Sequence, residues 1–185
     1  LQVIGKINDG KEATVYLCLM EHDRKHELAA AKIFKSKTFR GFKNEHNYRD
    51  FGRMRDRRAA KHMKGGSASG DRAFHHQWVR NEWDTLCTLY DIGVRVPEPI
   101  AQYPEGVLME FIGSATDGAA PRLVNCRLSG EELGNAARCL RRDAQRMLAN
   151  DIVHGDLSPY NVLYDGTEPV IIDVPQAMDP RTTPK

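Results

Sequence analysis

The first part of the chain alternates apolar and polar residues in a pattern typical of β-strands. Residues 1–7 alternate and then stop at a turn-forming Asn-Asp-Gly triplet. The alternation returns over 13–20, and 28–34 is an almost wholly apolar run. This pattern predicts three antiparallel strands. Three more strands are predicted later in the chain, over 107–111, 162–164 and 170–174.

Residues 73–91 have the spacing of an amphipathic helix. Apolar side chains recur at helical intervals before Gly93, at Phe74, Trp78, Leu86 and Leu89. Glu82 lies four residues from Trp78 and four from Leu86, so its carboxylate shares the apolar face. A buried carboxylate is costly unless it is paired, and Glu82 therefore needs a partner.

A second helix is predicted from residue 129 onward. Ser129 and Glu132 have the spacing of a capping box. The apolar stripe of this helix is predicted to consist of Leu133, Ala137, Leu140, Ala144 and Met147 with Leu148.

Composition limits the class of protein. With 185 residues, 41% of them hydrophobic and 28% charged, the chain is long enough for one domain or two small lobes around a cleft. No apolar run approaches the roughly 20 residues that a bilayer requires, so no membrane partner is expected. There is no basic start followed by an apolar stretch, and the four cysteines form no CxxC pair. A reduced, cytoplasmic location is therefore expected.

The small net charge of +2 hides an asymmetry. Residues 35–80, hereafter the basic segment, hold 13 basic and 4 acidic residues, which gives +9 there and −7 in the rest of the chain. Such a segment is either a solvated surface or a patch that faces phosphates, of RNA or of a phosphorylated partner. Within it, the Gly- and Ser-rich stretch 65–70 is predicted to be a flexible hinge or a disordered tip.

The candidate chemistry is concentrated near the C-terminus. Asp156 and Asn161 lie five residues apart in a predicted loop, and Asp173 lies in the apolar run 171–174. An isolated carboxylate in such a run would be costly, so a cation partner is expected. Magnesium fits because it takes a few oxygen ligands and leaves other positions to water and phosphate oxygens. The alternative is that Asp173 caps a backbone amide.

These residues match the protein-kinase template HxDxxxxN with a later metal-binding Asp, although Val-Pro follows Asp173 and the DFG sequence is absent. Lys32, within Ala-Ala-Ala-Lys-Ile, lies in a strand that could present it to phosphates, and Glu82 is the carboxylate that could pair with it. Residues 8–16 occupy the place of the glycine-rich loop but keep only Gly10. The ordered set predicts phosphoryl transfer.

The chain resembles the RIO atypical serine/threonine protein kinases, most closely their RIO1-like subgroup. The resemblance runs through four motifs: Gly-Lys-Glu-Ala-Thr-Val-Tyr (10–16), Val-Leu-Met-Glu-Phe-Ile-Gly (107–113), His-Gly-Asp-Leu-Ser-Pro-Tyr-Asn (154–161) and Ile-Ile-Asp-Val (171–174). It implies an α+β, two-lobed protein-kinase-like fold. Residues 1–108 would be an antiparallel-sheet N-lobe with a flexible basic insert over 35–72. Residues 109–185 would be the hinge and a reduced, mainly helical C-lobe.

The resemblance also implies roles for individual residues, with ATP and Mg²⁺, or Mn²⁺, as cofactors. Lys32 would hold the α- and β-phosphates, with Glu82 fixing its rotamer, at a loop that contains Gly10. The carbonyl of Glu110 and the amide of Ile112 would bind the adenine edge.

By the same resemblance, Asp156 would orient the nucleophile, and Asn161 and Asp173 would bind the metal. The resemblance further implies that Asp173 itself accepts the phosphoryl group in an ATPase cycle. The implied partners are a protein substrate or the chain itself, at Ser67 or Ser69, and ribosomal RNA or a pre-ribosomal particle at the basic segment.

Two departures from the family pattern qualify the resemblance. Pro159 stands where many relatives have an acidic residue, which suggests a bacterial relative. The sequence ends soon after Pro180, and from the resemblance we expect the closing helices of the family to be missing or trimmed. Two other functions stay open. The His-Gly-Asp motif is shared with small-molecule phosphotransferases of the aminoglycoside-kinase kind, and the basic segment would suit a nucleotide-gated RNA-binding scaffold.

Overall fold

The structure is a computed structural model that describes residues 1–22, 25–35, 68–174 and 177. Most of the basic segment, including Ser67, lies outside these ranges. Within them, no helix is both long enough and apolar enough to cross a bilayer.

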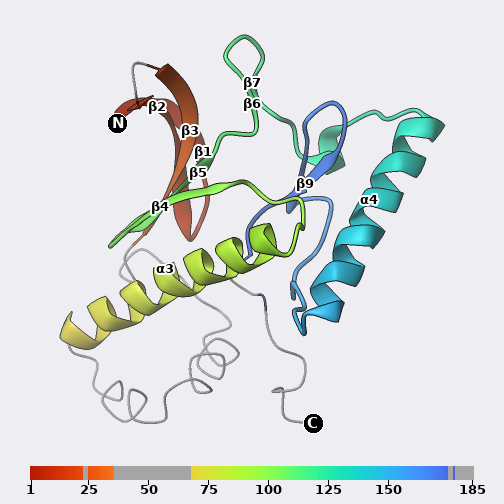
Figure 1. The fold of residues 1–185 in the computed structure, drawn as a ribbon. Coiled ribbons are helices and arrows are strands. Elements are labelled where there is room, and N and C mark those ends of the chain that lie inside the picture. Colours follow the sequence, from red (N-terminus) through yellow and green to blue (C-terminus); the bar gives the residue numbers. More distant parts are fainter. Residues whose placement is uncertain (23–24, 36–67, 175–176, 178–185) are drawn as a thin grey trace.

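A five-stranded antiparallel sheet forms the first part of the fold, in the order β1-β2-β3-β5-β4 (Figure 1). The strands are β1 (Gln2–Asp9), β2 (Ala13–His22), β3 (Lys25–Phe34), β4 (Pro99–Tyr103) and β5 (Gly106–Glu110). The first three confirm the prediction of three antiparallel strands. Strand β4 is not predicted from the sequence. Its first residue, Pro99, argues against a central strand, but it is tolerated here because β4 is at the edge of the sheet.

Helix α3 (Ala68–Asp91) runs along the sheet and supplies part of its core (Figure 1). Trp78, Leu86 and Leu89 are buried, as their spacing predicts. The helix begins earlier than predicted. Residues 68–72 are helical, so the predicted insert over 35–72 and the predicted hinge over 65–70 both extend too far, and Ser69 lies in the first turn of α3.

The second part of the chain consists of short strands around one long helix. In chain order these are β6 (Gly113–Ser114), β7 (Gly118–Ala119), the 3-10 helix η2 (Leu123–Asn125), α4 (Gly130–Ala149), β8 (Val162–Tyr164) and β9 (Pro169–Ile171). The predicted capping box of α4 is confirmed. The Ser129 hydroxyl accepts a hydrogen bond from the Glu132 amide at 3.3 Å, and the Glu132 carboxylate accepts one from the Ser129 amide at 2.7 Å.

The predicted apolar stripe of α4 is wrong in part. Leu133 and Leu148 are 59% and 60% exposed. The buried side chains are those of Ala136, Cys139, Asp143 and Met147. The buried face therefore differs from the predicted one. It includes the polar Asp143, whose carboxylate accepts a hydrogen bond from the Arg95 amide in the loop that follows α3.

One hydrophobic cluster joins the two parts of the chain. It includes Phe34 from the sheet, Leu89 from α3, Met147 from α4 and Ile171 from β9. The architecture is α+β, as predicted. The predicted lobe boundary at 108/109 falls inside β5, which continues to Glu110, so the sheet extends two residues beyond that boundary.

Candidate functional site

Lys32 is a buried cation near the C-terminal end of β3. Its strand neighbours are Val15 on β2 and Val107 on β5, which hold it in the centre of the sheet. The Nζ donates to Glu82 Oε1 at 2.6 Å and to Asp173 Oδ1 at 2.8 Å. The partner that the sequence requires for Glu82 is therefore Lys32, and the predicted pairing is confirmed.

Burial and charge act against each other in this group. Burial disfavours the ammonium of Lys32, but the carboxylates of Glu82 and Asp173 outweigh burial and raise its pKa. Burial also raises the pKa of Glu82, and the charge of Lys32 only partly offsets that effect. The buried Oε2 of Glu82 accepts no hydrogen bond within the described part of the chain. Lys32 is thus charged at neutral pH and fixed to α3.

Asp173 occupies a special backbone position just after β9. Its φ of 63° lies in the left-handed region, so the strand ends at Ile171 and does not continue to residue 174 as predicted. The side chain is 47% exposed. Partial burial would raise the pKa of Asp173, but Lys32 overcomes that effect and lowers it. The cation partner expected for this carboxylate is therefore supplied by Lys32.

Asp156 and Asn161 lie in the same loop and touch each other. The Asn161 side-chain amide donates to the Asp156 carbonyl oxygen and to Asp156 Oδ2, at 2.9 Å in both cases. These bonds use the nitrogen of the amide and leave its oxygen as a ligand atom. The Asp156 carboxylate is thereby held in one orientation.

His154 connects this loop to the segment before Asp173. Its Nδ1 accepts a hydrogen bond from the Asp156 amide at 3.3 Å, so Nε2 carries the proton and faces the Ile172 carbonyl oxygen at 3.4 Å. Burial lowers the pKa of His154. The ring is therefore neutral and links both loops of the site.

The β8–β9 hairpin brings Asn161 and Asp173 to neighbouring positions. Val162 pairs with Ile171, and the Ile172 amide donates to the Asn161 carbonyl oxygen at 2.9 Å. No cluster of three or more His, Cys, Asp or Glu residues suited to a metal occurs among the residues described. One amide oxygen and one carboxylate nevertheless fit magnesium, which binds few protein oxygens when phosphate and water complete its shell.

Gly10 lies in the tight turn between β1 and β2. Its amide donates to the Ala13 carbonyl oxygen at 2.9 Å, and a Cβ at this position would approach that oxygen to 3.2 Å. Lys35, which is not among the predicted site residues, donates to Asp9 Oδ1 at 2.6 Å and to the Gly10 carbonyl oxygen at 2.7 Å. Chiefly through the Lys35 hydrogen bond, this arrangement lowers the pKa of Asp9.

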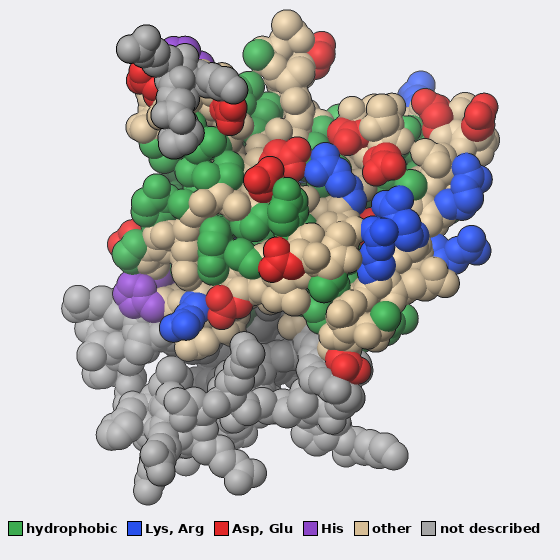
Figure 2. All heavy atoms as spheres, in the orientation of Figure 1, with side chains coloured by type: hydrophobic (Ala, Val, Ile, Leu, Met, Phe, Trp, Pro, Cys, Tyr) green, Lys and Arg blue, Asp and Glu red, His purple; other side chains and the backbone are tan. Residues whose placement is uncertain are grey.

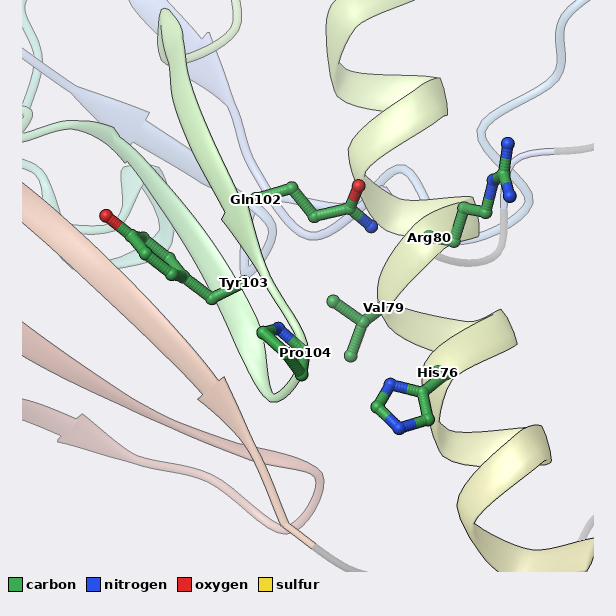
Figure 3. Close-up of a pocket in the computed structure, with 6 residues that line it drawn as sticks. All are labelled: His76, Val79, Arg80, Gln102, Tyr103 and Pro104. Carbon is green, nitrogen blue, oxygen red and sulfur yellow. The ribbon is translucent and has the colours of Figure 1, made fainter.

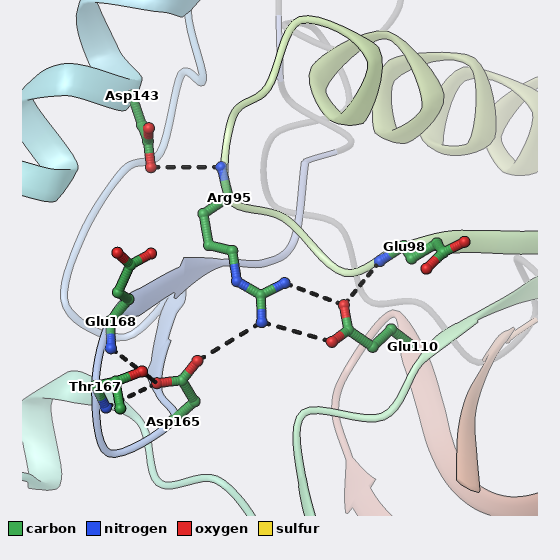
Figure 4. Close-up of polar contacts among 7 residues, drawn as sticks. All are labelled: Arg95, Glu98, Glu110, Asp143, Asp165, Thr167 and Glu168. Atoms are coloured by element: carbon green, nitrogen blue, oxygen red, sulfur yellow. Dashed lines mark hydrogen bonds and ion pairs between the residues drawn. The ribbon is translucent and has the colours of Figure 1, made fainter. Parts of the chain in front are cut away.

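The predicted adenine contacts lie where β5 ends. Glu110 is the last residue of the strand, and its amide donates to the Glu98 carbonyl oxygen at 2.8 Å. Ile112 is buried, and its carbonyl oxygen accepts from the Ala120 amide at 2.9 Å. The Glu110 carboxylate faces Arg95, which Figure 4 shows at the centre of a polar network.

Three members of that network are not predicted from the sequence: Arg95, Asp143 and Asp165. The burial of Asp143 was predictable from its spacing, because it lies three residues after Leu140 and four before Met147. Glu82 lies between apolar neighbours on α3 in a similar way. Arg95 and Asp165 lie in loops and carry no periodic signal.

Arginines of α4 also form a basic patch on the right of Figure 2, in addition to the basic segment.

A pocket of about 290 Å³ lies outside this site. It is formed between α3 and the β4–β5 turn (Figure 3). Its lining residues are His76, Val79, Arg80, Gln102, Tyr103 and Pro104. None of them is a predicted site residue, so the pocket is separate from the candidate chemistry.

Comparison with known proteins gives consistent results. The family model described as the RIO domain matches residues 14–184. A serine/threonine-protein kinase RIO1 from Chaetomium thermophilum is 30% identical over 188 residues, which cover 96% of this chain and 35% of the relative. A RIO-type serine/threonine-protein kinase Rio1 from Haloferax volcanii is 32% identical over 174 residues, covering 94% of this chain and 54% of the relative.

The fold is similar to that of solved kinases. The crystal structure of the Rio2 kinase-ADP/Mg²⁺-phosphoaspartate complex from Chaetomium thermophilum superimposes with a TM-score of 0.65 at 20% identity, covering 97% of this chain and 49% of that chain. This likeness confirms the kinase-like fold. The chain spans only 35% and 54% of the two relatives named above. The match to the family model covers most of the sequence, and the chain therefore belongs to the RIO domain family.

Proposed function

We propose that this chain is an ATP- and Mg²⁺-dependent protein serine/threonine kinase of the RIO type, with ATP hydrolysis as a second output. The observation that carries the proposal is the position of Lys32 Nζ, 2.6 Å from Glu82 and 2.8 Å from Asp173. The printed names of the relatives are those of protein kinases, which favours a protein substrate over a small alcohol.

Each residue then has a task in phosphoryl transfer. Lys32 moves from Asp173 to the α- and β-phosphates, and its ammonium stays hydrogen-bonded to Glu82. The turn containing Gly10 approaches the phosphates, and the Glu110 carbonyl and Ile112 amide bind the adenine edge. Asp156, oriented by Asn161, receives the proton of the attacking hydroxyl.

Magnesium, held by Asn161 and Asp173, would neutralise the charge that develops on the phosphoryl oxygens. Once Lys32 has moved to the phosphates, both Asp173 oxygens are available. The solved Rio2 structure is described as a phosphoaspartate complex. We propose that Asp173 can likewise take the γ-phosphoryl group: its carboxylate oxygen bonds to phosphorus as the bond to the ADP oxygen breaks.

The test is incubation of the purified chain with γ-labelled ATP and magnesium. Asp156→Asn should reduce phosphate transfer to serine by about 100-fold or more, because the acceptor of the hydroxyl proton is lost. Nucleotide binding should be largely retained. The matched control is Asp84→Asn, which changes an exposed Asp on α3 and should label like the wild type. Undiminished serine labelling in Asp156→Asn would remove Asp156 from this role.

Hydroxylamine treatment separates the two outputs. Serine phosphate survives it and aspartyl phosphate does not, so label that is lost marks an acyl phosphate, as proposed for Asp173, and label that is retained marks a hydroxyl acceptor. Replacement of Ser67 and Ser69 by Ala then shows whether either residue is the autophosphorylation site.

RNA remains a proposed partner of the basic segment, most of which lies outside the described residues. Its positive charge supports the proposal. RNA binding that weakens steeply with salt and disappears when the segment is neutralised is the expected result.

A further inference from the structure

Arg95 connects two regions that are distant in sequence. It lies in the loop between α3 and β4, and its side chain is 30% exposed. Nη1 is 3.1 Å from Glu110 Oε2, and Nη2 is 3.5 Å from Glu110 Oε1 and 3.6 Å from Asp165 Oδ2. Figure 4 shows the guanidinium between the two carboxylates. One side chain thus joins the end of β5 to the β8–β9 turn.

The backbone of Arg95 is fixed as well. Its carbonyl oxygen accepts from the Ile171 amide of β9 at 2.9 Å, and its own amide donates to Asp143 Oδ2 at 3.4 Å. Asp143 is fully buried and is also bound by Arg142 at 3.0 Å. The guanidinium therefore extends from an anchored backbone, so its position is defined.

The two partners of Arg95, Glu110 and Asp165, belong to segments at opposite ends of the proposed nucleotide site. Glu110 ends the strand that presents the adenine contacts, and its Oε2 also accepts from the Glu98 amide at 3.1 Å. Asp165 lies in the turn of the hairpin whose ends carry Asn161 and Asp173.

The two oxygens of Asp165 have different partners. Oδ1 closes the hairpin turn by accepting from the Thr167 amide and hydroxyl and from the Glu168 amide, at 2.7–2.8 Å. Oδ2 faces Arg95. Loss of charge at Asp165 therefore affects the ion pair more than the turn.

We propose that Arg95 is a positioning residue that sets the distance between the adenine contacts and the metal-binding side chains. This inference rests on the proposed function. A ligand that bridges two subsites binds more tightly than its halves only when the subsites are held at a matching separation. Arg95 does not contact the reacting atoms; it acts through Glu110 on one side and Asp165 on the other.

The test compares whole nucleotide with its halves. Arg95→Met should raise the Kd for ATP in magnesium by about tenfold, because the two subsites are no longer held at a fixed distance. The Kd values for adenosine alone and for magnesium tripolyphosphate alone should change by less than about twofold. Arg95→Lys should restore part of the loss. The matched control is Arg80→Met, which removes an exposed arginine of α3 paired with Asp84.

Asp165→Asn provides a second variant that keeps the amide oxygen for the turn. It should show the same selective loss of ATP affinity, and it therefore tests the inference even where Arg95→Met fails to fold. Unchanged ATP affinity, or equal weakening of ATP and both halves, would overturn the inference. If the wild type does not bind magnesium ATP at all, the proposed function fails instead.

Discussion

At the scale of single residues, the buried Lys32–Glu82 pair is the feature most sensitive to change. The two side chains are 11% and 5% exposed, so the loss of Lys32 leaves Glu82 as an uncompensated buried group. Lys32→Met should lower the free energy of unfolding by about 3–5 kcal/mol at neutral pH. The double variant Lys32→Met/Glu82→Leu should recover most of this loss, because it removes the buried carboxylate as well and leaves only the 47% exposed Asp173 without its cation.

Urea unfolding measures this cycle. Lys6→Met is the control, since it removes a lysine from the exposed pair with Asp9 and should cost no more than about 1 kcal/mol. Additive losses in the double variant would show that Lys32 and Glu82 do not act as a pair.

His154 makes stability depend on pH. Burial holds its pKa below the ordinary 6.5, so the unfolded chain takes up a proton at a higher pH than the folded chain. Its contribution to stability is therefore complete above about pH 6.5 and is lost as the pH falls further. In NMR titration, the His154 ring should titrate with a midpoint below 6.5, from the Nε2-protonated form. A midpoint at or above 6.5 would contradict the buried, neutral ring.

At the scale of elements, the buried side of α4 distinguishes the structure from the sequence pattern. The two predicted core residues at its end, Met147 and Leu148, are 3% and 60% exposed. Met147→Ala should cost about 2–5 kcal/mol of unfolding free energy because it leaves a cavity. Leu148→Ala should stay within about 0.5 kcal/mol. Thermal or urea unfolding of this matched pair checks the assignment, and a larger loss for Leu148→Ala would reverse it.

Local sequence signals were sufficient for most elements. Alternation located β1 and β2, an almost wholly apolar run located β3, and the Ser129–Glu132 box fixed the start of α4. Local signals failed where tertiary contacts determine whether a strand forms or where it ends. β4 exists because β5 offers it an edge, and β9 ends early because Asp173 turns into the left-handed region to meet Lys32. A buried acid such as Asp143 changes which face of a helix is covered.

At the scale of the whole molecule, the candidate site lies where the sheet, α3 and the C-terminal hairpin meet. The pairing of Lys32 with Glu82 follows from the sequence, since a buried carboxylate requires a cation. The contacts of Arg95 do not follow, because they join loops with no periodicity. Phe34, Met147 and Ile171 belong to one hydrophobic cluster, so a single core supports both halves of the site.

The central claim is that Asn161 and Asp173 hold a divalent ion that presents a triphosphate to Lys32 and Asp156. A crystal structure with Mn²⁺ and a non-hydrolysable ATP analogue, with the metal located by its anomalous signal, tests this most directly. We expect a metal peak between Asn161 and Asp173, with Lys32 Nζ moved from Asp173 to the phosphates and still bound to Glu82. A bound analogue with no metal between these two side chains, or with Lys32 still on Asp173, would contradict it.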